Sequence, residues 1–287
     1  MAGQRTASLT LDRERIRHLT GPGAQDSRIM IVGLGSGGFP VVQHLGMSGW
    51  TRFILIDPDT LAPENLVKHP ARRRDQRQLK VDVAAKWLLD RNPQCVVSKY
   101  PEDVTAIAPD ELAELVRGCD MVVSATDSNP VRHFINDICV ASQTAMTVGL
   151  VHRGGIGGTV MAFRPGKSGC YACLESVAEG VDGLPTDEDY PQTEFEQQMI
   201  YGRGIRDYAA AGLSADIALV AAVHAQVTVV ELLARELPET PTVPRLSASW
   251  VAIQIRSNDS WHWRFTEFEL PRIDGCVSCG APVIVAD

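Results

Sequence analysis

The chain has 287 residues, 45% of them hydrophobic and 22% charged, so it can bury a substantial core in one large domain or two small ones. Its formal net charge of -8 argues against a nucleic-acid-binding surface, because phosphate contacts need clustered lysine and arginine. The first residues lack the apolar core of a signal peptide, and the longest uncharged apolar stretch, 217–230, is too short to span a membrane, so we expect a cytoplasmic protein.

Residues 1–27 are expected to form an arm ahead of the main domain. They carry Arg13, Arg15 and Arg17 in a short helical pattern, followed by a Gly-Pro-Gly break at 21–23. We expect residues 28–287 to form a single domain, with a first half at 28–150 that binds a nucleotide and a second half at 151–287.

A glycine-rich loop opens this domain. An unbroken apolar run at 29–32 predicts a buried strand, and Gly33, Gly35 and Gly38 follow it at GxGxxG spacing before a helix at 39–47. Such glycines let backbone N–H groups approach a phosphate at the positive end of the helix. Asp57, at the end of the next apolar run, stands where an acidic residue binds a ribose. The pattern predicts an adenine-nucleotide site and leaves the nucleotide open.

Strand and helix patterns then alternate as far as residue 151. This alternation predicts an α/β fold, a doubly wound, Rossmann-like, mostly parallel sheet with helices on both faces and ligands beyond the carboxyl ends of its strands. Asp57 and Asp127 both lie at such ends. The expected strands are 52–56, 96–100, 121–125 and 145–151, and the expected helices are 81–91, 109–117 and 129–142.

The second half is less regular. We expect a glycine-rich turn at 154–158, a long loop at 179–206, and a long helix at 215–237 that is almost apolar all round in its first half and lies in the core or at a subunit interface. Alternating residues at 245–256 and 261–270 predict a carboxyl-terminal antiparallel hairpin.

Four of the seven cysteines form two CxxC pairs. In a reducing compartment such pairs are typical metal ligands, and four thiolates complete a tetrahedral structural zinc site with no open position for catalysis. The other three, Cys95, Cys119 and Cys139, lie in or beside apolar segments and are expected to be buried small hydrophobes. The expected zinc ligands are Cys170, Cys173, Cys276 and Cys279.

The motifs together resemble one family. In order along the chain, these motifs are GLGSGG, IDPDTLAPENL, Lys80, TDSNPVRHFIN and the two CxxC pairs, each of which we call a knuckle. Their combination resembles the ThiF/MoeB/ubiquitin-activating enzyme adenylyltransferases over nearly the whole chain. The resemblance implies a Mg-ATP enzyme that adenylates the carboxyl terminus of a small ubiquitin-like or sulfur-carrier protein, or of a peptide. The apolar helix at 215–237 and the arginine-bearing arm favour a homodimer. The second half would then hold zinc and the substrate tail.

The resemblance also assigns roles to residues. It implies that Gly33, Gly35 and Gly38 form the nucleotide loop, that Asp57 binds the ribose, and that Asp59, Asn65 and Lys68 belong to the nucleotide site. Lys80 matches the phosphate lysine and Asp127 the magnesium aspartate, with Arg132 and Asn136 completing the motif of the following helix. Arg15 is the best match to an arginine that reaches into the partner subunit's active site. As plainer alternatives, Asp127 caps a helix, Lys80 and Arg15 are surface charges, and Asn65 and Asn136 are turn or cap residues.

This chemistry is consistent with the residues present. A carboxylate is already ionised at neutral pH and needs no general base to attack an α-phosphorus. The barrier lies in bringing anions together, so positioning, a metal and fixed cations should supply the catalysis. Mg²⁺ prefers carboxylate and phosphate oxygens, which Asp127 and the nucleotide provide.

Two features depart from the family pattern. The family has arginine and then glutamine shortly after its Asn-Leu pair, whereas this chain has Lys68 and His69 there. Lysine keeps the charge but loses the bidentate fork, and the nearby Arg72, Arg73 and Arg74 are candidates to replace it. In addition, no cysteine lies between Cys173 and Cys276, so a thioester step through that region is not expected.

Two other functions remain open. An NAD-dependent oxidoreductase would share the loop and Asp57 but would leave Asp59, Lys80, Asp127 and the knuckles unexplained. A non-catalytic nucleotide-binding subunit, paired with an active one, is compatible with Lys68 and His69.

Overall fold

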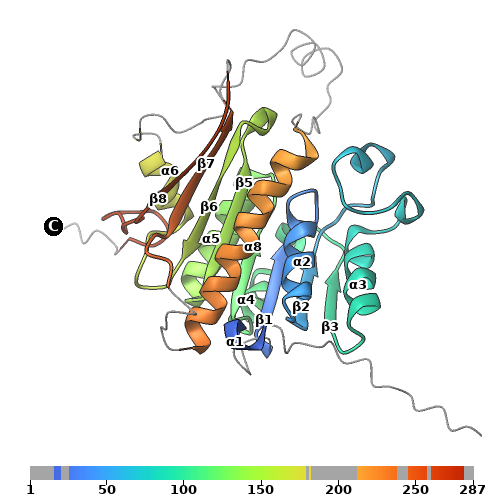
Figure 1. Ribbon diagram of the computed structural model, residues 1–287. Helices are drawn as coiled ribbons and strands as arrows, with labels where there is room; N and C mark the ends of the chain where they lie inside the picture. Colours follow the sequence, from blue (N-terminus) through green and yellow to red (C-terminus); the bar gives the residue numbers. More distant parts are fainter. Residues whose placement is uncertain are drawn as a thin grey trace, which may run out of the picture.

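A single mixed sheet of eight strands forms the centre of the protein (Figure 1). The computed structural model describes residues 16–20, 26–178, 181, 212–237, 245–256 and 260–280. The short helix α1 (Arg17–Thr20) is the described part of the expected arm, and Arg13 and Arg15 lie outside the described residues.

The strand order is β3-β2-β1-β4-β5-β6-β7-β8. The first five strands pair in parallel and the last three antiparallel, so the expected mostly parallel sheet with a carboxyl-terminal hairpin is confirmed. The strands are β1 (Arg28–Val32), β2 (Arg52–Ile56), β3 (Val96–Tyr100), β4 (Met121–Ser124), β5 (Met146–Val151), β6 (Gly157–Phe163), β7 (Trp250–Arg256) and β8 (Trp261–Phe268).

Helices cover both faces of the sheet because successive strand residues point to opposite sides. Ile29 and Ile31 pack with the first helix group, while Met30 and Val32 pack with the second. The first group is α2 (Gly38–Met47), α3 (Lys80–Arg91) and α8 (Ser214–Glu236); the second is α4 (Pro109–Arg117), α5 (Asn129–Ser142) and α6 (Tyr171–Ala178).

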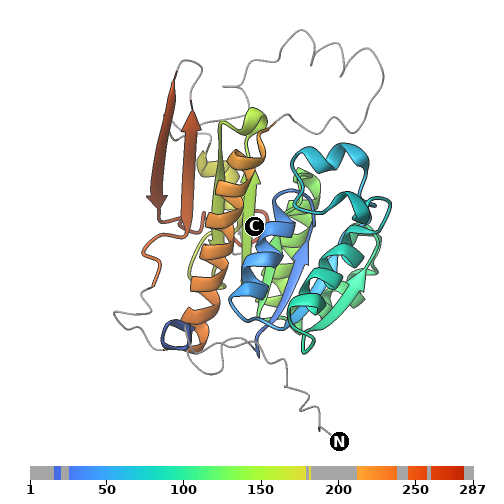
Figure 2. The same ribbon diagram turned by 45° about the vertical axis from the view of Figure 1, so that its right-hand side comes forward.

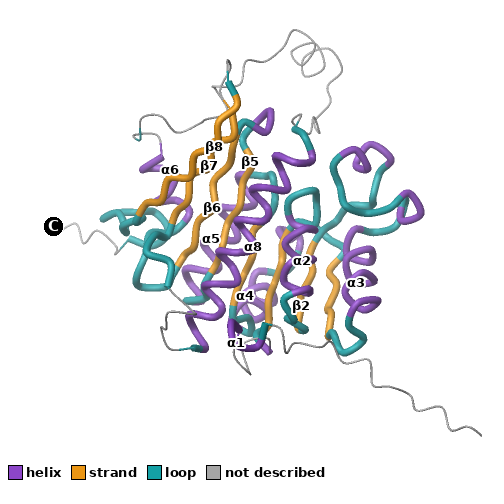
Figure 3. The backbone as a smooth tube through the Cα atoms, viewed as in Figure 1, coloured by secondary structure: helices purple, strands orange, loops and turns teal. Residues whose placement is uncertain are grey.

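The carboxyl ends of three neighbouring parallel strands lie at one edge of the sheet. Val32, the last residue of β1, is in register with Ile56 of β2 and Ser124 of β4. The loops that follow these strands therefore meet at this edge (Figure 3). They carry the glycine-rich loop, Asp57 and Asp127.

The long helix α8 lies along one face of the sheet beside α2 (Figure 2). By length and composition it could cross a membrane, but it packs on β5 and β6 as a core helix does, and its Val220 and Val227 are buried in one apolar cluster with Val160 and Ala162 of β6. The expectation that this helix lies in the core is confirmed.

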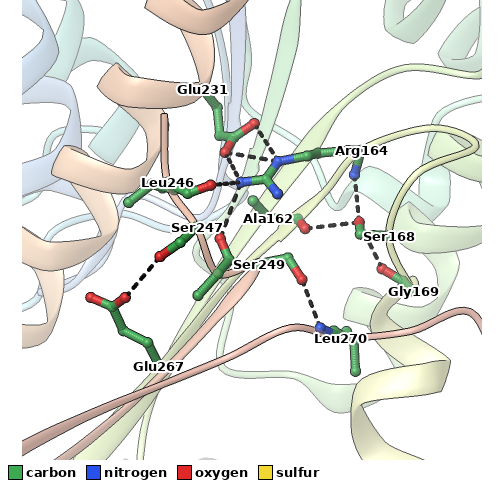
Figure 4. A network of polar contacts seen from close by, with 11 residues as sticks. Ala162, Arg164, Ser168, Gly169, Glu231, Leu246, Ser247, Ser249, Glu267 and Leu270 are labelled. Carbon is green, nitrogen blue, oxygen red and sulfur yellow. Dashed lines mark hydrogen bonds and ion pairs between the residues drawn. The ribbon is translucent and has the colours of Figure 1, made fainter. Parts of the chain in front are cut away.

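The strand expected at 245–256 begins later, at Trp250. The carbonyl groups of Leu246 and Ala248 accept hydrogen bonds from the Arg164 side chain instead of pairing with a neighbouring strand. The Arg164 guanidinium also forms a fork with Glu231 of α8, with N···O distances of 2.6–3.0 Å (Figure 4). This polar network fixes the entry to β7 against α8. The turn predicted at 257–260 lies mostly outside the described residues, as does the loop predicted at 179–206.

Candidate functional site

The glycine-rich loop contains two kinds of glycine. Gly33 has φ +91°, and a Cβ there would lie 2.7 Å from the Ala125 carbonyl oxygen. A Cβ on Gly38 would lie 1.9 Å from the Gly33 carbonyl oxygen, so the fold itself requires both glycines. At Gly35 and Gly37, by contrast, a Cβ would meet nothing within 4 Å among the described residues. These two positions leave the backbone open to a ligand.

Asp57 is tied to this loop by both carboxylate oxygens. Oδ2 accepts a hydrogen bond of 2.6 Å from the backbone N–H of Leu34, and Oδ1 accepts one of 2.9 Å from the N–H of Asp59. Burial raises the pKa of the Asp57 carboxyl, and the positive charge of Lys80 opposes that rise. Each carboxylate oxygen retains a lone pair, so these bonds leave Asp57 able to accept from a ribose hydroxyl as well.

Lys80 lies beside both aspartates. Its Nζ is 2.6 Å from Asp59 Oδ2 and 3.9 Å from Asp57 Oδ1. The Lys80 residue is only 8% exposed, whereas the Asp59 side chain is 62% exposed. The structure therefore brings together three of the predicted site residues at the start of α3, with a cation held next to the loop.

The segment after β2 carries Asn65 and Lys68. Asn65 Oδ1 accepts a hydrogen bond of 3.0 Å from the N–H of Ala62 and closes the short helix η2 (Pro63–Val67). Lys68 directly follows this helix and is half-buried. In this structure Asn65 acts as the cap residue that its plainer interpretation predicted.

His69, which the sequence marks only as a departure from the family pattern, lies against the glycine-rich loop. It is buried, its Nε2 lies 2.9 Å from the carbonyl oxygen of Leu34, and its Nδ1 accepts a hydrogen bond of 3.1 Å from the N–H of Ala71. The available signal was its place in the family pattern, where glutamine is expected.

Asp127 lies between β4 and α5 and is exposed. Among the described residues its carboxylate has no hydrogen bond or ion pair, so it is accessible to a cation. Arg132 bends back toward the same loop, where its Nε donates a hydrogen bond of 3.1 Å to the carbonyl oxygen of Thr126.

Asn136 lies elsewhere, at the cysteine cluster. It is fully buried, its Oδ1 accepts a hydrogen bond of 2.8 Å from the N–H of Tyr171, and its Nδ2 lies 3.7 Å from Cys170 Sγ. Its side chain therefore connects α5 to the first CxxC knuckle. In this chain, Asn136 supports the knuckle.

The four predicted zinc ligands converge, with all four sulfurs within 4.8 Å of one another. Individual Sγ···Sγ distances are 4.0 Å for Cys170–Cys173, 3.7 Å for Cys170–Cys276 and 3.4 Å for Cys173–Cys279. Sulfurs bound tetrahedrally to zinc at about 2.3 Å lie about 3.8 Å apart, so the residues fit this ion. Burial raises the pKa of the Cys173 thiol to about 11, and a divalent cation would supply the charge that stabilises thiolates there.

The remaining cysteines are also as predicted. Cys95, Cys119 and Cys139 are all buried, and none belongs to the four-cysteine cluster.

Comparison with protein families gives a match over most of the chain. The model of the ThiF family matches residues 20–274. The chain belongs to the ThiF family.

Several named relatives of this ThiF-family chain are adenylyltransferases. A molybdopterin-synthase adenylyltransferase of Escherichia coli is 32% identical over 155 residues, which are 53% of this chain and 60% of that protein. A sulfur carrier protein adenylyltransferase of Thermus thermophilus is 30% identical over 172 residues, covering 56% of this chain and 62% of that protein. An adenylyltransferase and sulfurtransferase of Candida albicans is 29% identical over 58% of this chain and 37% of its own length. The matched region thus spans less than two thirds of each of these relatives.

Solved structures show that the fold is shared. Escherichia coli MccB, solved with ATP, superposes with a TM-score of 0.66 at 20% identity, over 90% of this chain and 68% of that chain. The structure of PaaA gives a TM-score of 0.61 at 18% identity, over 85% of this chain and 73% of that chain.

Proposed function

We propose that this ThiF-family chain binds Mg-ATP and adenylates the carboxyl terminus of a small ubiquitin-like or sulfur-carrier protein, or of a peptide, with release of pyrophosphate. The supporting observation is the convergence, at one edge of the sheet, of an open glycine loop, the Asp57–Asp59–Lys80 group and an exposed Asp127. Relatives named as adenylyltransferases for sulfur carriers and for molybdopterin synthase support the same chemistry.

Each group has a part in this chemistry. The backbone at Gly35 and Gly37 is open to the phosphates of ATP, and Asp57 accepts from the ribose. Lys80 is held by Asp59 close to the loop, so its ammonium group lies near where the nucleotide would add negative charge. The attacking carboxylate is already ionised, so positioning and charge neutralisation suffice.

Asp127 would hold Mg²⁺, which would neutralise phosphate charge when bound. The four cysteines would hold zinc in a structural site, away from the chemistry. We also propose a cytoplasmic homodimer in which Arg15 completes the partner subunit's site. Sedimentation of a fully active monomer would contradict that part.

The adenylate is expected to pass to a nucleophile from outside the chain. No cysteine lies between Cys173 and Cys276 in the sequence, so a thioester on that segment is not available. A sulfur donor, a partner protein or the substrate itself would take the acyl group.

A direct test looks for the product on the carrier. The purified chain is incubated with ATP, Mg²⁺ and a candidate carrier ending in Gly-Gly from the same genome, and the mass of the carrier is measured. We expect a gain of one adenylyl group with the free carboxyl terminus and none with an amidated carboxyl terminus or with the Asp127→Ala variant.

The alternatives predict different results. ATP binding without any adduct would indicate a non-catalytic subunit, which Lys68 in place of the expected arginine leaves possible. Saturable binding of NADH in place of ATP would indicate an oxidoreductase and would contradict the proposal.

A further inference from the structure

One residue of the nucleotide loop is held on both sides by side chains from elsewhere in the fold. Leu34 stands between Gly33 and Gly35, and its side chain is fully buried. Its N–H donates to Asp57 at 2.6 Å, and its carbonyl oxygen lies 2.9 Å from Nε2 of His69. The two peptide groups on either side of Leu34 are therefore oriented by the side chains of Asp57 and His69, next to the open position at Gly35.

The ring of His69 is itself fixed in one orientation. The N–H of Ala71 donates to its Nδ1, so Nδ1 is unprotonated and Nε2 carries the proton that it donates to Leu34. The ring packs against Phe39 of α2, with a centroid distance of 5.0 Å. His69 thus joins the segment after β2 to the loop and to the first turn of α2.

We propose that His69 is a positioning residue that holds Leu34, and with it the nucleotide loop, in the geometry that binds ATP, and that protonation of His69 loosens this hold. The inference rests on the proposed ATP site. Neutral His69 satisfies one donor and one acceptor of the backbone. A second proton would lie on Nδ1 and point at the N–H of Ala71. Two donors would then face each other where the neutral ring has a hydrogen bond.

The charges around His69 act in both directions. Burial lowers the pKa of His69 from its ordinary value of 6.5, and the charge of Lys80 lowers it further, while the Leu34 carbonyl group and Asp75 raise it. The Asp57 carboxylate lies on the other side of Leu34. The neutral ring's contribution to the free energy of unfolding is therefore complete above pH 6.5 and is progressively lost below that value, whereas the hold on the loop in the folded chain is lost only around the lowered pKa of His69.

A glutamine at position 69 can hold Leu34 in place without changing its own charge with pH. Its amide N–H₂ can donate to Leu34 and its carbonyl oxygen can accept from Ala71, but it has no pKa in this range. His69→Gln should therefore retain the hold on the loop and lose the part of the pH dependence that His69 causes. His44, which is exposed on α2, offers a matched control through His44→Gln.

The experiment measures the Kd of Mg-ATP by competition with a fluorescent ATP analogue, at several values between pH 5 and pH 8.5. Protonation of the nucleotide's phosphates and of Asp57, whose pKa burial raises, weakens binding in acid in every variant, so each profile is compared with that of His69→Gln. His69→Gln should bind within about threefold of the unmodified chain at neutral pH. The unmodified chain and His44→Gln should lose about tenfold more affinity than His69→Gln between neutral and acidic pH, the cost of one hydrogen bond. His69→Ala should bind about tenfold more weakly than His69→Gln at neutral pH and show the same relative loss in acid as His69→Gln.

Each outcome is informative. Unchanged ATP affinity in His69→Ala, or an undiminished acid loss in His69→Gln, would overturn the inference while leaving the proposed function intact. Failure of the unmodified chain to bind ATP at any pH would instead overturn the proposed function. If His69→Ala does not fold, as circular dichroism would show, the pH profile of His69→Gln alone decides.

Discussion

The glycines of the nucleotide loop have different surroundings, and this difference leads to opposite expectations for two similar substitutions. In Gly38→Ala the new Cβ would lie 1.9 Å from the Gly33 carbonyl oxygen, so backbone must move. We expect this variant to lose about 3 kcal/mol of stability and, with the loop displaced, its ATP binding. In Gly35→Ala no atom of the described residues lies within 4 Å of the Cβ, so the fold should be unaffected.

Thermal unfolding and ATP binding, measured on both variants, test this expectation. Gly35→Ala should keep its Tm and still bind ATP at least about tenfold more weakly, because the methyl group occupies space that the phosphates need. Normal ATP affinity in Gly35→Ala would mean that no ligand approaches the backbone at this glycine.

At the residue scale the sequence predicted residue types better than their contacts. GxGxxG spacing identified Gly33 and Gly38 because the positive φ of Gly33 and the close approach of Gly38 to the Gly33 carbonyl group are local to the turn. The contacts of His69 and Asn136 depend on Leu34 and Cys170, which are distant in sequence. No local pattern contains such pairings, so only the folded arrangement shows that Asn136 serves the cysteine cluster.

Among the elements, α8 is fixed to the sheet by a partly buried ion pair as well as by apolar packing. The side chain of Glu231 is 10% exposed and that of Arg164 27%, with their closest atoms 2.6 Å apart. Glu231→Gln would leave the guanidinium without its counter-charge, and we expect a loss of about 3 kcal/mol. Chemical denaturation measures this change.

Asp90→Asn provides the comparison for this variant. Asp90 pairs with Lys86 one turn away on α3 at the same distance of 2.6 Å, but both side chains are more than half exposed. Such a pair contributes about 0.5 kcal/mol or less. Equal losses in the two variants would contradict a special role for the Arg164–Glu231 pair.

Elements with clear patterns were predictable, since short apolar runs such as 29–32 and 53–56, each followed by a turn signal, favour buried strands, and both runs are fully buried. The start of β7 was not, because alternation at 245–249 resembles a strand. There the carbonyl groups of Leu246 and Ala248 bond to Arg164, a contact that no local pattern contains.

Across the whole molecule, the cysteine cluster joins segments that are about a hundred residues apart. It links the knuckle at the start of α6 with residues 276–279 near the end of the described chain. We expect about one zinc per chain by metal analysis. Cys173→Ala should release it and lower Tm by roughly 10 °C, since 1 kcal/mol corresponds to about 2–4 °C in a domain of this size.

Cys139→Ala is the matched control, because Cys139 is equally buried but lies outside the cluster. It should keep the metal and lose only the packing of one small side chain. Retention of zinc by Cys173→Ala would contradict the assignment of the ligands.

The central claim concerns reversible formation of an acyl-adenylate, and exchange of labelled pyrophosphate into ATP measures this step directly. With Mg²⁺ and a carrier that has a free carboxyl terminus, we expect label to enter ATP, and Asp127→Ala to reduce the rate at least about a hundredfold. Exchange that does not require the carrier's carboxylate, or that persists undiminished in Asp127→Ala, would contradict the account.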